Sequence, residues 1–132
     1  MHDTPNAGNA AILPLRMLVI DDNQSAADAL AKLLTIRGHI VDTAYSGTEA
    51  IAAAPVFAPE VVLLDIGLPD MEGYEVARAL RADPETSSAV IIALTGYGQD
   101  SDIKNAERAG FNHHLTKPAG LSEIEAILGT IA

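Results

Sequence analysis

The sequence contains no cysteine among its 132 residues. Disulfide bonds and thiolate metal sites are therefore excluded, and a reducing cytoplasm is the compartment we expect. No apolar run approaches the roughly 20 residues of a transmembrane helix, and residues 1–6 lack the basic segment that opens a signal peptide. Basic residues are also scarce, since 8 lysines and arginines face 18 aspartates and glutamates, for a formal net charge of −10. This charge argues against nucleic acids and anionic membranes as partners.

What is present is an alternation of short apolar runs and helical patterns. The expected strands are Met17–Ile20, Ile40–Ala44, Val61–Asp65, Ala89–Leu94 and Phe111–Thr116. Parallel strands joined by helices need right-handed crossovers, so five such pairs predict an α/β fold. We expect one domain over residues 15–132, a flavodoxin-like (βα)5 doubly wound parallel sheet with strand order 2-1-3-4-5. Residues 1–14 are small and polar and predict a mobile tail.

Local signals predict where two of the helices begin and where one of them ends. Ser46 and Glu49 have the spacing of a capping box, in which Ser46 accepts from the Glu49 N–H and the Glu49 side chain reaches back to Ser46. The short helix that follows is expected to end at Pro55. Pro69–Asp70 is expected to open the next helix, with Arg81 on its outer face.

Polar residues that suit phosphate chemistry follow four of the expected strands. Asp21 and Asp22 follow the first strand, Asp65 ends the third, and Thr95 and Lys117 follow the fourth and fifth. Each residue alone is more simply a turn former, a helix cap or half of an ion pair. The predicted strand order places all of them at one edge of the sheet. Clustered carboxylates suit Mg²⁺, and a hydroxyl and a lysine beside them suit phosphoryl transfer onto Asp65.

Four segments in this order resemble a known family. They are Leu18–Asn23, Val62–Gly73, Ala93–Tyr97 and Leu115–Pro118. The sequence is similar to the receiver domain of two-component response regulators, the CheY-like family, over residues 15–131. In that family Asp65 would be the phosphoacceptor. The resemblance implies that Asp22, Asp65 and the backbone carbonyl of Gly67 bind Mg²⁺ directly, and that Asp21 acts through a metal-bound water.

The resemblance also implies a switch. Thr95 would move to bind a phosphoryl oxygen, and Lys117 would pair with Asp65 at rest and with the phosphoryl group after transfer. Gly96, Tyr97 and Pro118 would flank the site, and the Lys117–Pro118 bond is commonly cis in the family. His114 stands where the family often has an aromatic switch residue. Either it switches with a polar ring, or the coupling is weaker, or it is a partly buried strand histidine with no signalling role.

These features lead us to expect a signalling module rather than an enzyme. A histidine kinase or histidine phosphotransferase would be the donor, and the surface of the fourth helix, fifth strand and fifth helix would bind a partner. We expect no output domain, a monomer or weak dimer, and either a freestanding regulator, a phosphorelay shuttle or a receiver from a hybrid kinase.

Two other functions are possible from the residues. A Mg²⁺-dependent aspartyl-phosphate phosphohydrolase of the haloacid-dehalogenase type needs a second aspartate where this chain has Gly67. A phosphorylation-independent interaction domain would use the same fold without the chemistry. A flavodoxin is rejected, because Asp21 and Asp22 would repel the cofactor phosphate.

Overall fold

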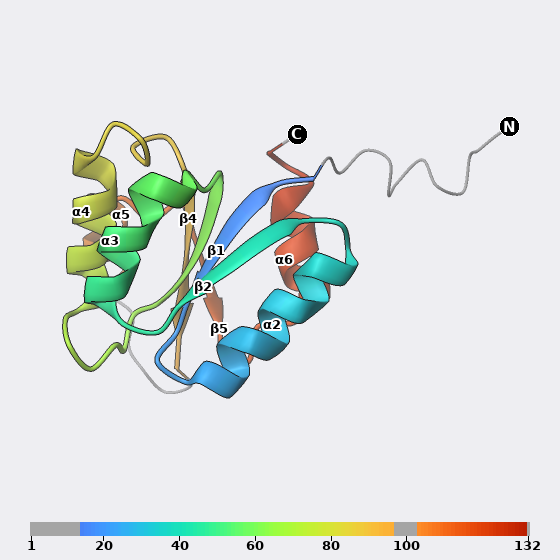
Figure 1. The fold of residues 1–132 in the computed structure, drawn as a ribbon. Coiled ribbons are helices and arrows are strands. Elements are labelled where there is room, and N and C mark those ends of the chain that lie inside the picture. Colours follow the sequence, from blue (N-terminus) through green and yellow to red (C-terminus); the bar gives the residue numbers. More distant parts are fainter. Residues whose placement is uncertain (1–13, 97–102, 132) are drawn as a thin grey trace, which may run out of the picture.

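A computed structural model describes residues 14–96 and 103–131. Within them, five parallel strands form one sheet in the order β2-β1-β3-β4-β5. The strands are β1 (Arg16–Ile20), β2 (Ile40–Ala44), β3 (Val61–Asp65), β4 (Val90–Thr95) and β5 (His113–Thr116). The helices are α2 (Gln24–Ile36), α3 (Gly47–Phe57), α4 (Gly73–Ala82), α5 (Ile103–Ala109) and α6 (Leu121–Leu128). Helices α3, α4 and α5 cover one face of the sheet, and α2 and α6 cover the other (Figure 1). The predicted flavodoxin-like fold is confirmed. The predicted tail lies, apart from Pro14, outside the described residues.

Strand β3 lies at the centre of the sheet, and all five of its residues are buried. Val62 and Leu64 pack toward α3 and α4, whereas Val61 and Leu63 pack toward α2 and α6. A fully buried Val or Leu side chain stabilises a fold by about 1.5–3 kcal/mol. Because β3 pairs with β1 on one side and β4 on the other, its last residue, Asp65, is fixed between the ends of both neighbours.

Helix α3 differs from its prediction in two details. The Ser46 hydroxyl accepts from the Glu49 N–H (3.0 Å), as predicted. The Glu49 carboxylate, however, accepts from the N–H of Tyr45 rather than Ser46. The helix also continues through Pro55 to Phe57, although proline has no N–H to donate to the helix.

Helix α4 begins at Gly73, with Glu72 as its N-cap, so the opening predicted at Pro69–Asp70 is wrong. Arg81, near the other end of α4, is half-buried rather than outward-facing. Its five guanidinium N–H groups donate, over distances of 2.6–3.0 Å, to four acceptors. These are the backbone carbonyls of Ser87, Ala89 and Gly110 and the side-chain oxygen of Asn112. Arg81 thereby ties α4 to the start of β4 and to the turn before β5.

Gly110 fits this arrangement for two reasons. It has a φ of +109°, a backbone conformation that other residues rarely adopt. A Cβ atom at this position would also lie 2.7 Å from Cγ of Arg81. A larger residue would therefore displace the guanidinium as well as strain the turn.

His39 is buried at the turn from α2 into β2. Its Nδ1 atom accepts a hydrogen bond from the N–H of Leu15 (3.1 Å), so this nitrogen carries no proton. Burial lowers the pKa of His39, and the nearby charge of Glu125 on α6 opposes that shift only in part. The neutral ring holds the segment that enters β1.

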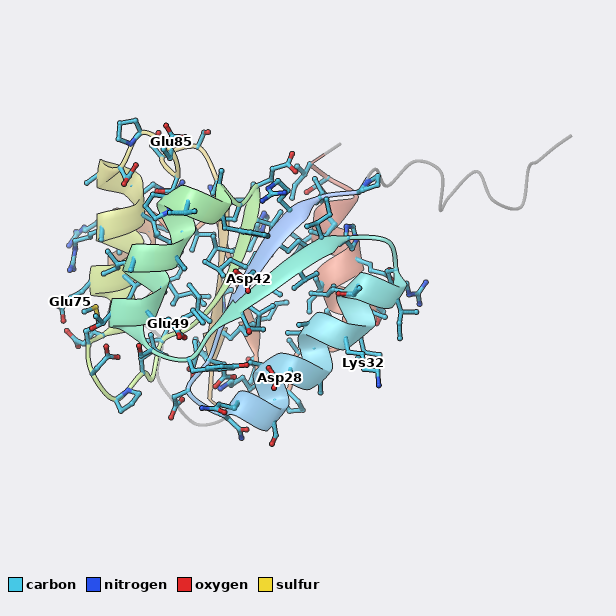
Figure 2. The ribbon with its side chains drawn as sticks, in the orientation of Figure 1. Asp28, Lys32, Asp42, Glu49, Glu75 and Glu85 are labelled. Atoms are coloured by element: carbon cyan, nitrogen blue, oxygen red, sulfur yellow. The ribbon has the colours of Figure 1, made fainter. Side chains whose placement is uncertain are left out.

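Charged side chains cover the outside of the helices and of the edge strand β2. Figure 2 shows examples, labelled Asp28, Lys32, Asp42, Glu49, Glu75 and Glu85, and all six are exposed. Among the described residues, no helix is both long and apolar enough to cross a membrane.

Candidate functional site

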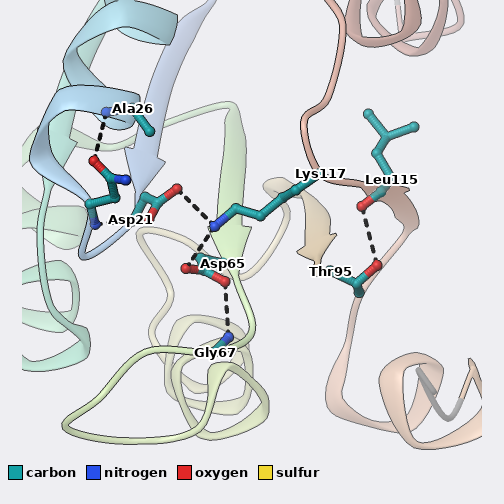
Figure 3. Close-up of polar contacts among 8 residues, drawn as sticks. Asp21, Ala26, Asp65, Gly67, Thr95, Leu115 and Lys117 are labelled. Carbon is teal, nitrogen blue, oxygen red and sulfur yellow. Dashed lines mark hydrogen bonds and ion pairs between the residues drawn. The ribbon is translucent and has the colours of Figure 1, made fainter. Parts of the chain in front are cut away.

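Asp65 is the last residue of β3 and is 5% exposed. Its Oδ1 atom accepts a hydrogen bond from the backbone N–H of Gly67 (2.9 Å), and its Oδ2 atom lies 3.0 Å from Nζ of Lys117 (Figure 3). Both oxygens therefore have a partner, and the side chain has one defined orientation at the carboxyl end of the central strand.

Asp21 and Asp22 follow β1, the neighbour of β3. Asp21 is 3% exposed and accepts from the N–H of Asn23 (3.0 Å), whereas Asp22 is exposed. Asp21, Asp22 and Asp65 each offer a carboxylate oxygen within 4.8 Å of the others. With the ammonium of Lys117, these three carboxylates leave a net charge of −2. Oxygen ligands with that charge fit a divalent cation such as Mg²⁺.

Lys117 bridges two of these carboxylates. Its Nζ atom lies 3.1 Å from Oδ2 of Asp21 and 3.0 Å from Oδ2 of Asp65 (Figure 3). Its backbone N–H donates to the Thr95 carbonyl (2.7 Å), and the Lys117–Pro118 peptide bond is cis. Burial alone would lower the pKa of Lys117, but hydrogen bonds and charges from Asp65 and Asp21 outweigh it, so the pKa is raised. The site therefore holds a permanent positive charge at neutral pH.

The remaining predicted residues are Thr95, Gly96, Tyr97 and His114. Thr95 is 4% exposed, and its hydroxyl donates to the Leu115 carbonyl on β5 (3.4 Å), as Figure 3 shows. His114 is on edge strand β5 with an exposed side chain, so it is not a partly buried histidine. Gly96 directly follows Thr95 and is half-buried. Tyr97 lies outside the described residues.

Gly67 lies in the loop of residues 66–72, which joins β3 to α4. The Ile66 N–H donates to the Leu94 carbonyl (3.1 Å), and the Gly73 N–H donates to the Ile66 carbonyl (3.1 Å). Leu68 is 8% exposed and belongs to the apolar cluster under α3 and α4. These contacts fix the two ends of the loop and one side chain inside it.

The sequence did not predict the role of Asp70 in this loop. Its Oδ1 atom accepts from the Gly47 N–H, and its Oδ2 atom accepts from both the N–H and the hydroxyl of Thr48, each at 2.9 Å. Gly47 and Thr48 are the first two residues of α3. The first N–H groups of a helix have no acceptor within the helix. The start of α3 therefore needs an acceptor from elsewhere in the chain, which is the clue that could have led to Asp70.

A groove of about 490 Å³ beside the site was also not predicted. It is lined by Asp21, Asn23, Ala26, Leu30, Leu33, Leu94, Lys117, Pro118 and Ala119. Asp21 and Lys117 supply its charged end, and α2 supplies an apolar wall. Leu33 in that wall is 46% exposed.

Comparisons with known proteins agree with this geometry. A family model for the response regulator receiver domain matches residues 17–129. The chain is 42% identical over 112 residues to the transcriptional regulatory protein KdpE of Mycobacterium tuberculosis, covering 85% of this chain and 48% of that protein. It therefore spans about half the length of that relative. It is 35% identical over 116 residues to protein PilH of Pseudomonas aeruginosa, covering 88% of this chain and 93% of PilH.

A solved structure carries the same fold. It is the receiver domain of the sensor histidine kinase PA1611 from Pseudomonas aeruginosa, crystallised with a magnesium ion coordinated in its active-site cleft. The TM-score is 0.78 at 29% identity, over 89% of this chain and 97% of that one. Since the family model covers nearly all of the described residues and the fold agrees, this chain belongs to the response regulator receiver domain family.

Proposed function

We propose that Asp65 accepts a phosphoryl group from a histidine kinase or histidine phosphotransferase, and that the change alters the chain's affinity for a protein partner. Receiver domains are signalling modules of two-component systems rather than classical enzymes, which fits this role. The observation that carries the proposal is the buried Asp65 carboxylate, held by Lys117 and Gly67 beside two further carboxylates. A cytoplasmic location stays a prediction from the sequence.

The acidic cluster is proposed to hold Mg²⁺. Asp22, Asp65 and the Gly67 carbonyl would be direct ligands, and Asp21 would act through a bound water. The charge of the cluster supports this, and so does the magnesium in the PA1611 receiver. When bound, the ion neutralises negative charge on the phosphoryl oxygens.

The side chains of this chain would orient and stabilise the transfer. An oxygen of Asp65 attacks phosphorus, the bond from phosphorus to the donor's histidine nitrogen breaks, and an acyl phosphate forms on Asp65. The Lys117 ammonium would leave the Asp65 oxygen and bind the transferred group instead. Thr95 would give up its bond to Leu115 and donate its hydroxyl to a phosphoryl oxygen.

These movements would connect the site to a partner-binding surface. Thr95 is on β4, and its present acceptor, Leu115, is on β5. A movement of Thr95 toward Asp65 therefore removes a contact between the two strands. We propose that the surface formed by α5, β5 and α6 responds and that its partner binds the two states differently. His114 is exposed on this surface.

The groove beside α2 is the proposed docking site for the donor protein. Its apolar wall includes Leu30 and Leu33. Its charged end contains Lys117, whose Nζ contacts Asp65, so a helix docked there would reach the site through Lys117. Docking on this wall would bring a phosphohistidine to the site without covering the α5–β5–α6 surface.

The test is intact-mass spectrometry after incubation with acetyl phosphate and Mg²⁺. The parent should gain one phosphoryl mass, whereas Asp65→Ala and a metal-free parent should gain none. Asp42→Ala, which removes an exposed aspartate from the edge strand β2, is the matched control and should behave like the parent.

The other outcomes separate the alternatives. No mass gain by a folded, Mg²⁺-bound parent would favour a phosphorylation-independent interaction domain. Continuous turnover of varied phosphate esters would favour a phosphohydrolase.

A further inference from the structure

The middle of the 66–72 loop has few attachments to the rest of the fold. Gly67, Pro69 and Asp70 are exposed, whereas Leu68 is buried and Met71 is half-buried. The backbone bonds of Ile66 and Gly73 described above fix the ends of the loop, and the Gly67 N–H donates to Asp65 Oδ1 (2.9 Å). Beyond that bond, the position of the Gly67 carbonyl depends on what holds the segment 68–71.

Asp70 supplies the polar attachment. Its carboxylate accepts three hydrogen bonds of 2.9 Å from Gly47 and Thr48, at the positive end of the α3 dipole. The bonds from Gly47 and from Thr48 lower the pKa of Asp70 to about 2, so the carboxylate is ionised at neutral pH. Charge-assisted bonds of this kind are stronger than neutral ones.

Met71 supplies an apolar attachment to the same place. A Cβ atom built on Gly47 would lie 2.3 Å from Cγ and 2.8 Å from Sδ of Met71, so the thioether rests directly on the helix backbone. Two successive loop residues thus contact the first turn of α3. This loop and this helix come from different crossovers of the sheet and meet only in the folded chain.

We propose that Asp70 is a positioning residue of the phosphorylation site, because it ties the loop that carries Gly67 to the N-terminus of α3. The inference rests on the proposed function, in which the Gly67 carbonyl is a Mg²⁺ ligand. Asp70 itself touches neither the metal nor the phosphoryl group. It acts by keeping the carbonyl in place, so that metal binding does not have to order the loop.

A second role for Asp70 would be to cap α3 and nothing more. Ser46 separates the two roles, because its hydroxyl accepts from the Glu49 N–H (3.0 Å) in the same helical turn. Ser46 and Glu49 both precede the loop in sequence and belong to the α3 end of the contact. Ser46→Ala therefore removes a cap from α3 without removing a bond to the loop. Asp70→Ala removes the bonds that join the loop to α3.

The experiment compares the parent with Asp70→Ala, Asp70→Asn and Ser46→Ala. Titration calorimetry with MgCl₂ alone measures the dissociation constant for Mg²⁺, and amide hydrogen exchange without metal measures protection in residues 66–70. We expect Asp70→Ala to weaken Mg²⁺ binding about tenfold, the low end of the effect of outer-shell partners, and to lose protection in the loop. Asp70→Asn keeps one acceptor oxygen, so its Mg²⁺ affinity should lie between those of Asp70→Ala and the parent. Ser46→Ala should bind Mg²⁺ like the parent.

Other results would refute either the inference on Asp70 alone or the proposed metal site together with it. Parent-like Mg²⁺ affinity and loop protection in both Asp70 variants would leave Asp70 as a helix cap only and would refute the inference alone. The same loss of affinity in Ser46→Ala would refute it too, since any damage to α3 would then suffice. A folded parent that binds no Mg²⁺ would refute the proposed metal site and this inference with it.

Discussion

Replacement of Arg81 by methionine is expected to cost about 3 kcal/mol of unfolding free energy. Methionine keeps most of the apolar stem of the side chain but removes the five N–H donors. Asn112 keeps another donor, the Ile91 N–H (2.8 Å), and the Ser87 carbonyl lies in an exposed turn where water can replace the arginine. The buried Ala89 and the half-buried Gly110 lose the arginine donors to their carbonyls, and an unsatisfied buried group costs about 1–3 kcal/mol.

Urea unfolding of the variant beside Arg78→Met tests this estimate. Arg78 is exposed on the same helix, and its replacement should change stability by less than about 0.5 kcal/mol. With a urea slope of about 1.5 kcal/mol per molar, Arg81→Met should lower the midpoint by about 2 M. A loss below about 1 kcal/mol would show that water satisfies these carbonyls as well as arginine does, and the reasoning would then be wrong.

Two further predictions concern His39 and Leu33. Since the pKa of folded His39 lies below its ordinary value of 6.5, the unfolded chain binds more protons just below that pH, and stability should fall as the pH drops through 6.5 toward the lowered pKa. His39→Asn should remove this contribution, which is at most about 1.4 kcal/mol per pH unit. Urea unfolding between about pH 7 and pH 5 measures how the unfolding free energy depends on pH. The same dependence in parent and variant would contradict the prediction. Leu33→Glu places a charge in the apolar wall of the groove, so it should slow transfer from a histidine phosphotransferase that phosphorylates the parent. Its rate with acetyl phosphate should not change, and equal slowing with both donors would argue against docking there.

The sequence predicted the fold and the proximity of four polar residues, because two simple regularities govern both. Apolar runs separated by helical patterns specify a parallel sheet, and parallel strands present their carboxyl ends at one edge. Asp21, Asp22, Asp65 and Lys117 could therefore be placed together before any coordinates were known. Strand ends shifted by only a residue or two between prediction and structure, as for β4, which runs to Thr95.

The contacts that were missed join elements whose relative position no local pattern encodes. Asp70 follows a proline and resembles a helix opener, yet its partners are at the start of α3. Arg81 follows the polar spacing of an exposed position, yet the turn at Gly110 folds back over it. Glu49 reaches Tyr45 because the chain bends before the helix begins. The Asp70 and Arg81 contacts depend on tertiary geometry, which exists only after the layers have packed, whereas the Glu49–Tyr45 contact is local.

The contact between Lys117 and the two aspartates has a consequence for partly folded chains. Its members come from sequence positions 21, 65 and 117, and they meet only when β1 has paired with β3 and the last strand has joined the sheet. Such distant pairings form late and cooperatively in folding. A nascent, truncated or misfolded chain therefore lacks this contact, so the phosphorylation proposed for Asp65 would itself report that the molecule is native.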